Sequence, residues 1–403
     1  MKVVTLESIT SEGGLITDGD WIESRDQDPT GTIRLIQLAD IGDGRFLDKS
    51  SKFVNDATSL RLNCTLLQAG DVLIARMPDP LGRACVFPKL ERRAITAVDV
   101  CIVRPDPRKV DPEWLSFRLN SRELRSEIQT HAQGATRSRV PTGKLKGISF
   151  GLPSLPEQQR IAVRLKAELS EVEIAKQAAK AQMRDAKLLR QRLLRKTFDA
   201  LHDVPRKVLG EWAKTTSGST PPRGDRRYWS PAEIPWVKTG EVAFAPITQT
   251  EESISRQALK ECSLTLLPPK SVLIAMYGQG KTRGQSAILE TEATTNQACF
   301  AIFPNDTWDA EFLHHWLMAS YEDLRGLSEG RGGNQANLNG ALLNALEIPA
   351  PRMAVQQSIV RRLKKQLAET DAIHQAAIAQ LAEIERLPQK LLAQAFPPQG
   401  DVK

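Results

Sequence analysis

The chain repeats its own pattern at an interval of 198 residues, and this duplication limits the folds available to it more than any single motif does. The matched anchors, which align without a gap, are Asp111–Leu115 with Asp309–Leu313, Pro153 with Pro351, Gln158–Gln159 with Gln356–Gln357, and Phe198 with Phe396. Between such anchors the two copies differ, and residues 25–40 have no visible counterpart in residues 221–238. The sequence therefore predicts two copies of one framework with different loops.

Each copy has the same order of predicted elements, with strands first and a long helix last. In the first copy, apolar runs bounded by Gly, Pro and Asp predict strands at 32–38, 72–75 and 98–103. Asp111, as a cap before a proline, predicts the start of a helix that reaches about Gln129. A mixed domain of strands and helices therefore precedes each long helix.

The run from Glu157 to about Phe198 contains no Gly or Pro, so it predicts one helix of roughly 40 residues and about 60 Å. A compact domain of a hundred residues has a radius of gyration of only ~13 Å, so such a helix must extend beyond its domain. In both copies apolar residues recur at two positions of a seven-residue repeat. The first position holds Leu165, Val172, Ala179, Ala186 and Leu193 in the first helix and Leu363, Ala377, Ile384 and Leu391 in the second. The second position holds Ile161, Ala175 and Leu189 in the first helix and Ile359, Ile373 and Leu387 in the second. This stripe favours pairing of the two helices over two unrelated surface helices, and Pro388 predicts an interruption of the second one.

Together these elements predict an α+β fold. Two similar globular mixed α/β domains are joined by two long antiparallel helices, a coiled-coil-like spacer, in a pseudo-twofold circular arrangement. The predicted parts are a first domain at 1–154, a first helix at 155–200, a second domain at 201–352 and a second helix at 353–398. Two domains with different loops suit a bipartite, asymmetric DNA target, because the grooves of B-DNA recur about every 34 Å.

The composition excludes several other classes of protein. The five cysteines include no Cys-x-x-Cys pair and the histidines show no metal-ligand spacing, which argues against a disulfide framework and a metal site. No apolar run approaches the ~18 residues of a membrane span, so we expect a cytoplasmic protein. The net charge of +7 over 403 residues permits a nucleic-acid partner without requiring one. Gly280-Lys281-Thr282 lacks the earlier glycine of a phosphate loop, because position 275 is alanine, and nucleotide binding is not predicted.

Several segments resemble one known family, the specificity (S) subunits of type I restriction-modification systems, or HsdS family. In the second copy, the opening block of the family's target recognition domain is resembled by Ser217–Asp225, Tyr228–Trp229 and Ile234–Glu241. Its central block is resembled by Leu273–Gly284 and Asn296–Ala298. The block before its helix is resembled by Gly333–Asn339 and Ile348–Pro351. In the first copy, Leu152–Ile161 opens the helix as the family does, whereas residues 13–22 and 76–78 resemble a different variant of the domain. The resemblance covers nearly the whole chain.

This resemblance implies a subunit without catalysis in which each target recognition domain reads one half of a bipartite DNA target. It implies double-stranded DNA as a partner, two methyltransferase (M) subunits held along the helices, and restriction (R) subunits that join the complex. S-adenosylmethionine and ATP would belong to those partner subunits, so no cofactor is expected in this chain.

The DNA-binding candidates are mainly basic, amide and hydroxyl side chains in predicted loops, because these groups bond phosphates and base edges. In the first domain they are Arg76, Arg83, Arg137, Ser138, Arg139 and Lys144. In the second domain they are Thr220, Arg223, Arg226, Arg227, Lys238, Tyr277, Gln279, Lys281, Arg283, Asn334 and Gln335. For each of them an ordinary surface or core role stays open. For the whole chain, the alternatives are a coiled-coil protein adaptor without DNA specificity and, more weakly, an enzyme with an unrecognised site.

Overall fold

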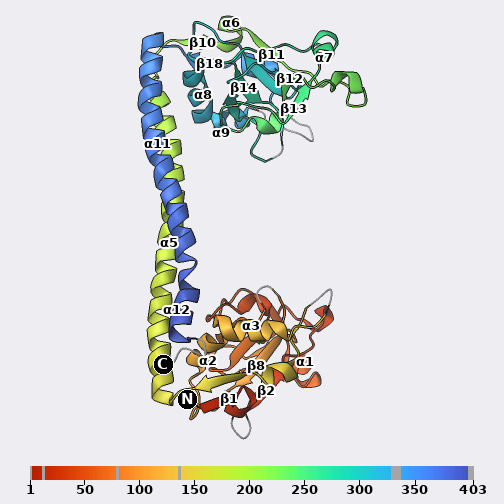
Figure 1. The fold of residues 1–403 in the computed structure, drawn as a ribbon, viewed down its shortest axis with the longest axis vertical. Helices are drawn as coiled ribbons and strands as arrows, with labels where there is room; N and C mark the ends of the chain where they lie inside the picture. The colour runs from red at the N-terminus through yellow and green to blue at the C-terminus, as the bar shows by residue number, and fades with distance from the viewer. Residues whose placement is uncertain are drawn as a thin grey trace. The chain divides into compact units, whose positions relative to one another are not determined.

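The computed structural model describes residues 2–10, 14–78, 81–134, 138–278, 280–327 and 337–397. The chain divides into a first unit, residues 1–179 with 379–403, and a second unit, residues 180–378. Each unit holds one mixed α/β domain and segments of the long helices (Figure 1).

The domain of the first unit contains three small sheets. Their strand orders are β2–β8–β5–β6, β4–β3–β7 and β1–β9, and β3 runs parallel to β7. The strands are β1 (Lys2–Thr5), β2 (Leu15–Asp18), β3 (Ile33–Ile36), β4 (Lys52–Val54), β5 (Val72–Ala75), β6 (Ala84–Val86), β7 (Ala94–Thr96), β8 (Val100–Arg104) and β9 (Ser149–Leu152). The helices of this domain are α1 (Asp56–Arg61), α2 (Pro112–Leu119), α3 (Arg122–Thr130) and α4 (Thr142–Lys146). All four residues of β5 are fully buried, because apolar clusters cover both faces of the four-stranded sheet.

The second unit has the same three sheets in the same order. Their strand orders are β11–β17–β14–β15, β13–β12–β16 and β10–β18, and β12 runs parallel to β16. The strands are β10 (Arg206–Val208), β11 (Thr215–Ser217), β12 (Ile234–Val237), β13 (Glu252–Ile254), β14 (Val272–Ala275), β15 (Ser286–Ile288), β16 (Thr294–Thr295), β17 (Cys299–Ile302) and β18 (Glu347–Pro349). The helices are α6 (Leu209–Trp212), α7 (Arg256–Glu261), α8 (Ala310–Ala319), α9 (Tyr321–Gly326) and α10 (Gly340–Asn344). The predicted duplication of a mixed domain is therefore confirmed strand by strand.

A segment that sequence identity leaves unmatched proves to be duplicated as well. β3, within residues 25–40, has the same neighbours in its sheet as β12, within residues 221–238. Each strand is followed by a short turn that a carboxylate closes: Asp40 accepts from the N–H of Gln37 (2.8 Å), and Glu241 accepts from the N–H of Lys238 (2.6 Å). An aspartate in one unit and a glutamate in the other make the same hydrogen bond, so the two turns correspond in structure although their sequences differ.

The helix predicted from Asp111 to about Gln129 is wrong in one respect, because the structure has two helices there, α2 and α3. Between them Ser121 takes an extended backbone (φ −62°, ψ 149°). Its neighbour Asn120 is buried, and its side chain both accepts from the N–H of Ala84 (3.1 Å) and donates to the Ala84 carbonyl (2.7 Å). These tertiary bonds to β6 end the first helix.

A buried glutamine joins each domain to its long helix. The side chain of Gln158 accepts from the N–H of Asp111 (2.9 Å) and donates to the carbonyls of Lys109 and Pro153 (both 3.0 Å). In the second unit, Gln356 accepts from the N–H of Asp309 (2.9 Å) and donates to two carbonyls at 2.8 Å. Both glutamines are fully buried. The anchors of the sequence repeat are therefore the residues that fasten domain to helix.

The long helices are α5 (Leu155–Asp199), α11 (Met353–Ile384) and α12 (Leu387–Ala395). Within the second unit α5 and α11 run antiparallel, since Arg190 pairs with Asp371 (3.2 Å) and the carbonyl of Met183 contacts the ring of His374 (3.2 Å). In the first unit Lys176 of α5 pairs with a residue just before α12 (3.0 Å). The predicted interruption is confirmed, because α11 ends before Pro388, which lies in the first turn of α12.

The predicted apolar stripe is only half buried. At one of its two positions most residues are buried, at Leu165, Ala179, Ala186, Leu363, Ala377 and Ile384, which are at most 7% exposed, and the others are half-buried. At the other position Ile359 is buried, but Leu189, Ile373 and Leu387 are exposed at 43%, 42% and 37%. The paired helices therefore keep apolar surface that no described residue covers.

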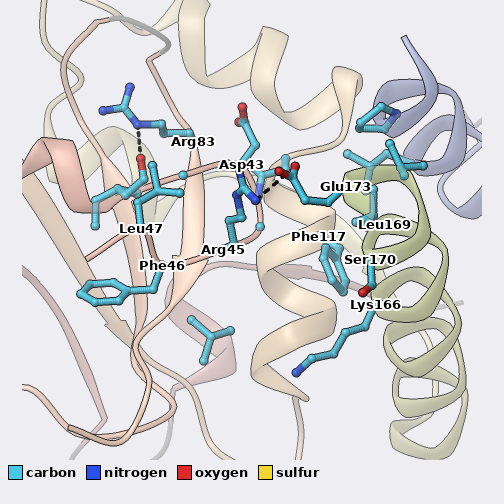
Figure 2. A pocket seen from close by; sticks show the side chains of 18 of the residues that line it. Asp43, Arg45, Phe46, Leu47, Arg83, Phe117, Lys166, Leu169, Ser170 and Glu173 are labelled. Atoms are coloured by element: carbon cyan, nitrogen blue, oxygen red, sulfur yellow. Dashed lines mark hydrogen bonds and ion pairs between the residues drawn. The ribbon is translucent and has the colours of Figure 1, made fainter. Parts of the chain in front are cut away.

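In the first unit a cavity of about 910 Å³ lies where the loop after β3 faces α2, α5 and α12 (Figure 2). Arg45 of the loop pairs with Glu173 of α5 (3.2 Å), and Lys166 of α5 pairs with Glu113 of α2 (2.7 Å). Ion pairs as well as apolar contacts therefore connect this domain to the helix.

Candidate nucleic-acid interface

In the second unit, the ends of β11 and β12 meet the turn before β17. Gly218 approaches this turn so closely that a Cβ would stand 1.9 Å from the carbonyl oxygen of Thr295, which requires glycine. The N–H of Ser219 donates to the same oxygen, and the N–H of Asn296 donates to the carbonyl of Val237 (both 3.0 Å). We call this region the second edge, made of residues 218–220, 237–239 and 295–298.

The side chains of the second edge bond one another. Oδ1 of Asn296 accepts from the hydroxyl of Thr239 (2.9 Å) and from the N–H of Ala298 (3.1 Å), which fixes the path of the turn. The hydroxyl of Thr220 donates to Oε1 of Gln297, whose side chain is exposed. The edge therefore presents an amide that a neighbour holds in place.

An arginine–tryptophan cluster adjoins the second edge, since the indole N–H of Trp236 donates to a backbone carbonyl of that edge (3.0 Å). The guanidinium of Arg223 lies 4.1 Å from the ring centroid of Trp229 and 4.9 Å from that of Trp236. Glu252 pairs with Arg223 and with Lys238, which lowers the pKa of this glutamate. Two predicted residues, Arg223 and Lys238, are thus brought together around one carboxylate.

Two further candidates lie on the short helix η4 (Arg226–Tyr228). Arg227 pairs with Asp225 (2.6 Å), which raises the pKa of Arg227, and its guanidinium lies 5.6 Å from the ring centroid of Tyr228. Arg226 is exposed. Within the described ranges, the side chain of Arg226 forms no ion pair, so its charge faces solvent.

The loop between β14 and β15 carries Tyr277, Lys281 and Arg283. Tyr277 is 41% exposed and Lys281 is exposed as well. The hydroxyl of Tyr321 on α9 donates to the carbonyl of Lys281 (2.6 Å), which anchors the loop. Arg283 is only 8% exposed. Of these two predicted DNA contacts, Lys281 is the accessible one and Arg283 is buried, and a role of either residue in DNA contact stays a prediction.

The first unit has the same edge with different side chains. The N–H groups of Gly19, Asp20 and Ala97 donate to the carbonyls of Val100 (2.8 Å), Thr96 (2.8 Å) and Ile36 (2.9 Å). These bonds match those of Gly218, Ser219 and Asn296 in the second unit. Burial raises the pKa of Asp20 to about 6. We call this region the first edge, made of residues 19–21, 36–38 and 96–99.

Arg76 is buried beneath the first edge. Its guanidinium donates to the carbonyls of Val140 (2.9 Å) and Val98 (3.1 Å) and pairs with Asp18 (2.6 Å), and the residue is 4% exposed. The equivalent residue after β14 is Met276, which is also buried. Three protein partners thus hold Arg76 beneath the edge, and its contact with DNA stays a prediction.

The other described candidates of the first domain, Arg83, Ser138, Arg139 and Lys144, are partly or fully accessible. Arg139 donates to the same Val98 carbonyl as Arg76 and keeps 32% of its side chain exposed. Ser138 is half-buried beside it, and Lys144 on α4 is exposed. Arg83 lies apart from them, and its guanidinium donates to backbone carbonyls of the loop after β3, one of them that of Leu38 at 2.7 Å. Arg83 therefore supports that loop.

Four predicted residues lie outside the described residues, namely Arg137, Gln279, Asn334 and Gln335.

The structure also places at these edges residues that sequence reasoning missed. They are Gln297 and Asn296 at the second edge and Trp21 at the first, where Trp21 is 67% exposed at the position of Thr220. The amides belong to a motif that is visible in the sequence, but their neighbours become known only from the fold. Trp21 was missed because its indole has neither the charge nor the amide or hydroxyl group by which the other candidates were chosen.

Two findings limit other interpretations of the described part of the chain. Within the ranges given above, no group of three or more His, Cys, Asp or Glu side chains could hold a metal ion. None of the helices in those ranges combines the length and the apolar character that crossing a membrane requires.

The duplicated domain with its paired helices defines a class of protein. A family model, the type I restriction modification DNA specificity domain, matches residues 16–182 and 203–383, and the chain belongs to this family. Both copies of the repeat are matched, so a coiled-coil adaptor without recognition domains is not supported.

Relatives with assigned functions are specificity subunits. The type I restriction enzyme EcoR124I/EcoR124II specificity subunit of Escherichia coli is 27% identical over 164 residues, 40% of this chain and 41% of that protein. The MjaIX specificity subunit of Methanocaldococcus jannaschii is 30% identical over 161 residues, 38% of this chain and 35% of that protein. Each match thus spans less than half of the relative's length. The EcoDI specificity subunit of E. coli is 24% identical over 331 residues, 72% of this chain and 70% of that protein.

Solved structures share the fold over almost the whole chain. The HsdS subunit from Thermoanaerobacter tengcongensis has a TM-score of 0.64 at 20% identity, covering 98% of this chain and 96% of that one. A chain from work on complex assembly and conformational transition of the type I R-M system has a TM-score of 0.74 at 19% identity, covering 98% and 97%. These likenesses establish the fold.

Proposed function

We propose that this chain is the DNA-specificity subunit of a type I restriction-modification complex, in which each domain reads one half of a bipartite, asymmetric DNA target. The observation that carries the proposal is the pair of edges. Their backbone bonds are the same in both units, whereas the side chains differ. Trp21 lies at the first edge, where Arg139 bonds the carbonyl of Val98, and Thr220 and Gln297 lie at the second. A common frame with different polar groups suits the reading of two different base sequences.

The partners in this proposal are double-stranded DNA, two methyltransferase subunits and, through the complex, restriction subunits. Support for docking on the helices comes from exposed apolar side chains that the helix pair leaves uncovered, with Val163 and Ile174 exposed at 71% and 67% in the first unit. Exposed apolar surface of this kind marks sites of protein association. In this proposal the chain has no catalytic role of its own. S-adenosylmethionine and ATP are bound by the partner subunits, and this chain needs no cofactor.

The methylome of a host tests the function. Co-expression of this chain with its cognate methyltransferase subunit should produce N6-methyladenine at one bipartite motif, and omission of this chain should abolish that methylation. A methylome without any motif that depends on this chain would refute the proposed function. An adaptor without DNA specificity predicts a methylome in which no motif depends on this chain.

A further inference from the structure

The second edge holds one exposed polar side chain in a defined orientation. We propose that Gln297 reads a base edge in the half-site recognised by the second domain and that Thr220 is its positioning residue. This inference rests on the proposed function and assigns specificity within it to two named side chains.

The first step of the argument is the rigidity of the turn. Asn296 is tied through its backbone N–H to Val237 (3.0 Å) and through Oδ1 to Thr239 (2.9 Å), while Ala298 is buried. Only Gln297, between them, points to solvent. A side chain on such a fixed turn enters a groove with its backbone already ordered, so less conformational entropy is lost on binding.

The second step is the polarity of the amide. Because Oε1 of Gln297 accepts from the hydroxyl of Thr220, the two N–H groups on Nε2 remain to donate outward. In the major groove, N7 and O6 of guanine, N7 of adenine and O4 of thymine accept such bonds. Gln297 is therefore suited to a base edge that offers an acceptor.

The third step is the comparison between the two units. The residues that take the positions of Thr220 and Gln297 at the first edge are Trp21 and Val98. There the carbonyl of Val98 accepts from Arg76 and Arg139, and neither of these two positions carries a side-chain amide. The backbone frame thus does not require the Thr220–Gln297 pair, so the side chains at these two positions can differ between the two domains without loss of the frame.

The test measures base preference in the complex with the methyltransferase subunit. Gln297→Ala should relax the preference at one base pair of one half-site by about 10- to 100-fold and leave the other half-site unchanged. Thr220→Val should relax the same position more weakly, and Thr220→Ser, which keeps the hydroxyl, should restore it. Gln257→Ala is the matched control, because the amide of Gln257 bonds Glu261 on α7 instead (3.0 Å).

Unchanged base preferences in Gln297→Ala, or an equal loss on all sequences, would overturn this assignment. Thermal unfolding of the same variants is the control for folding. Because Gln297 is exposed, its replacement should leave the melting temperature unchanged. If the unmodified chain directs methylation to no bipartite motif, the proposed function itself has failed. If the motif exists and Gln297→Ala reads it normally, only the assignment of Gln297 has failed.

Discussion

At the scale of single residues, burial separates basic side chains that support the fold from those that can meet a ligand. Arg76 has the basic character of a phosphate ligand, but it is buried and donates to two backbone carbonyls and to Asp18. Lys144 and Lys281 have the same charge and are exposed. The sequence could nominate all three residues, but it could not separate them, because burial depends on which strands become neighbours.

Arg76→Ala should lower the free energy of unfolding by about 2–3 kcal/mol, since Asp18 and the carbonyls of Val98 and Val140 each lose one donor. Lys144→Ala, at an exposed position, should change it by less than about 0.5 kcal/mol. Urea denaturation measures both. If the Arg76→Ala chain is as stable as the unmodified chain but binds DNA more weakly, Arg76 contacts DNA.

His314 should make the stability of the second unit depend on pH. Burial lowers its pKa from 6.5 to about 3, and its ring contacts the hydroxyl of Ser286 (3.0 Å). The folded state therefore holds this histidine neutral, and the stability it contributes is complete above pH 6.5 and is lost as the pH falls toward 3. Between pH 7 and pH 4 the loss should reach up to about 3 kcal/mol.

Urea denaturation across this pH range checks the sign. His314→Gln should flatten the pH dependence, whereas His202→Gln, at an exposed position, should leave it as it is. A pH dependence that stays steep in His314→Gln would assign the effect to other groups.

At the scale of elements, the repeat predicted the paired helices and the order of strands because the joints between elements are made by identical residues. Pro388 was also decisive, since a proline acts on a helix through its own backbone. The break between α2 and α3 could not be predicted, because it depends on a bond from Asn120 to a distant strand. The correspondence of β3 with β12 could not be predicted either, because it is recognised by strand pairing: β3 pairs with β7 and β12 pairs with β16.

Gln158→Ala and Gln356→Ala should each destabilise their own unit by about 2–4 kcal/mol, because each removal leaves one N–H and two carbonyls without a partner. The next residue in each copy supplies the control, since Gln159 and Gln357 are exposed. Gln159→Ala and Gln357→Ala should be close to neutral. Hydrogen exchange at the start of α5 and of α11 measures the local opening, and equal protection in all four variants would contradict the joint.

At the scale of the whole molecule, the two units are variations on one frame, and in the proposed function recognition depends on the side chains that each frame presents. The family and the duplication could be predicted from the sequence. The composition of the edges could not, because Gly218, Val237 and Asn296 are far apart in the chain and meet only through strand pairing.

Exchange of residues 215–345 for the corresponding domain of another specificity subunit should change one half of the methylated motif and keep the other half. The reason is that every bond of the second edge comes from the second unit itself. Methylome sequencing reads the result directly. A change in both halves after this single exchange would contradict independent reading by the two units.

The glutamine joints also fix an angle. Because Gln158 clamps the first turn of α5 to its own domain, that turn cannot rotate about the helix axis without breaking three hydrogen bonds. Every residue added farther along an α-helix turns the downstream part of the helix by about 100°. The joint therefore fixes the rotation of the first turn of the helix relative to its own domain. Insertion of about a whole number of turns farther along would leave the downstream part of the helix facing the same way, whereas insertion of a single residue would rotate it.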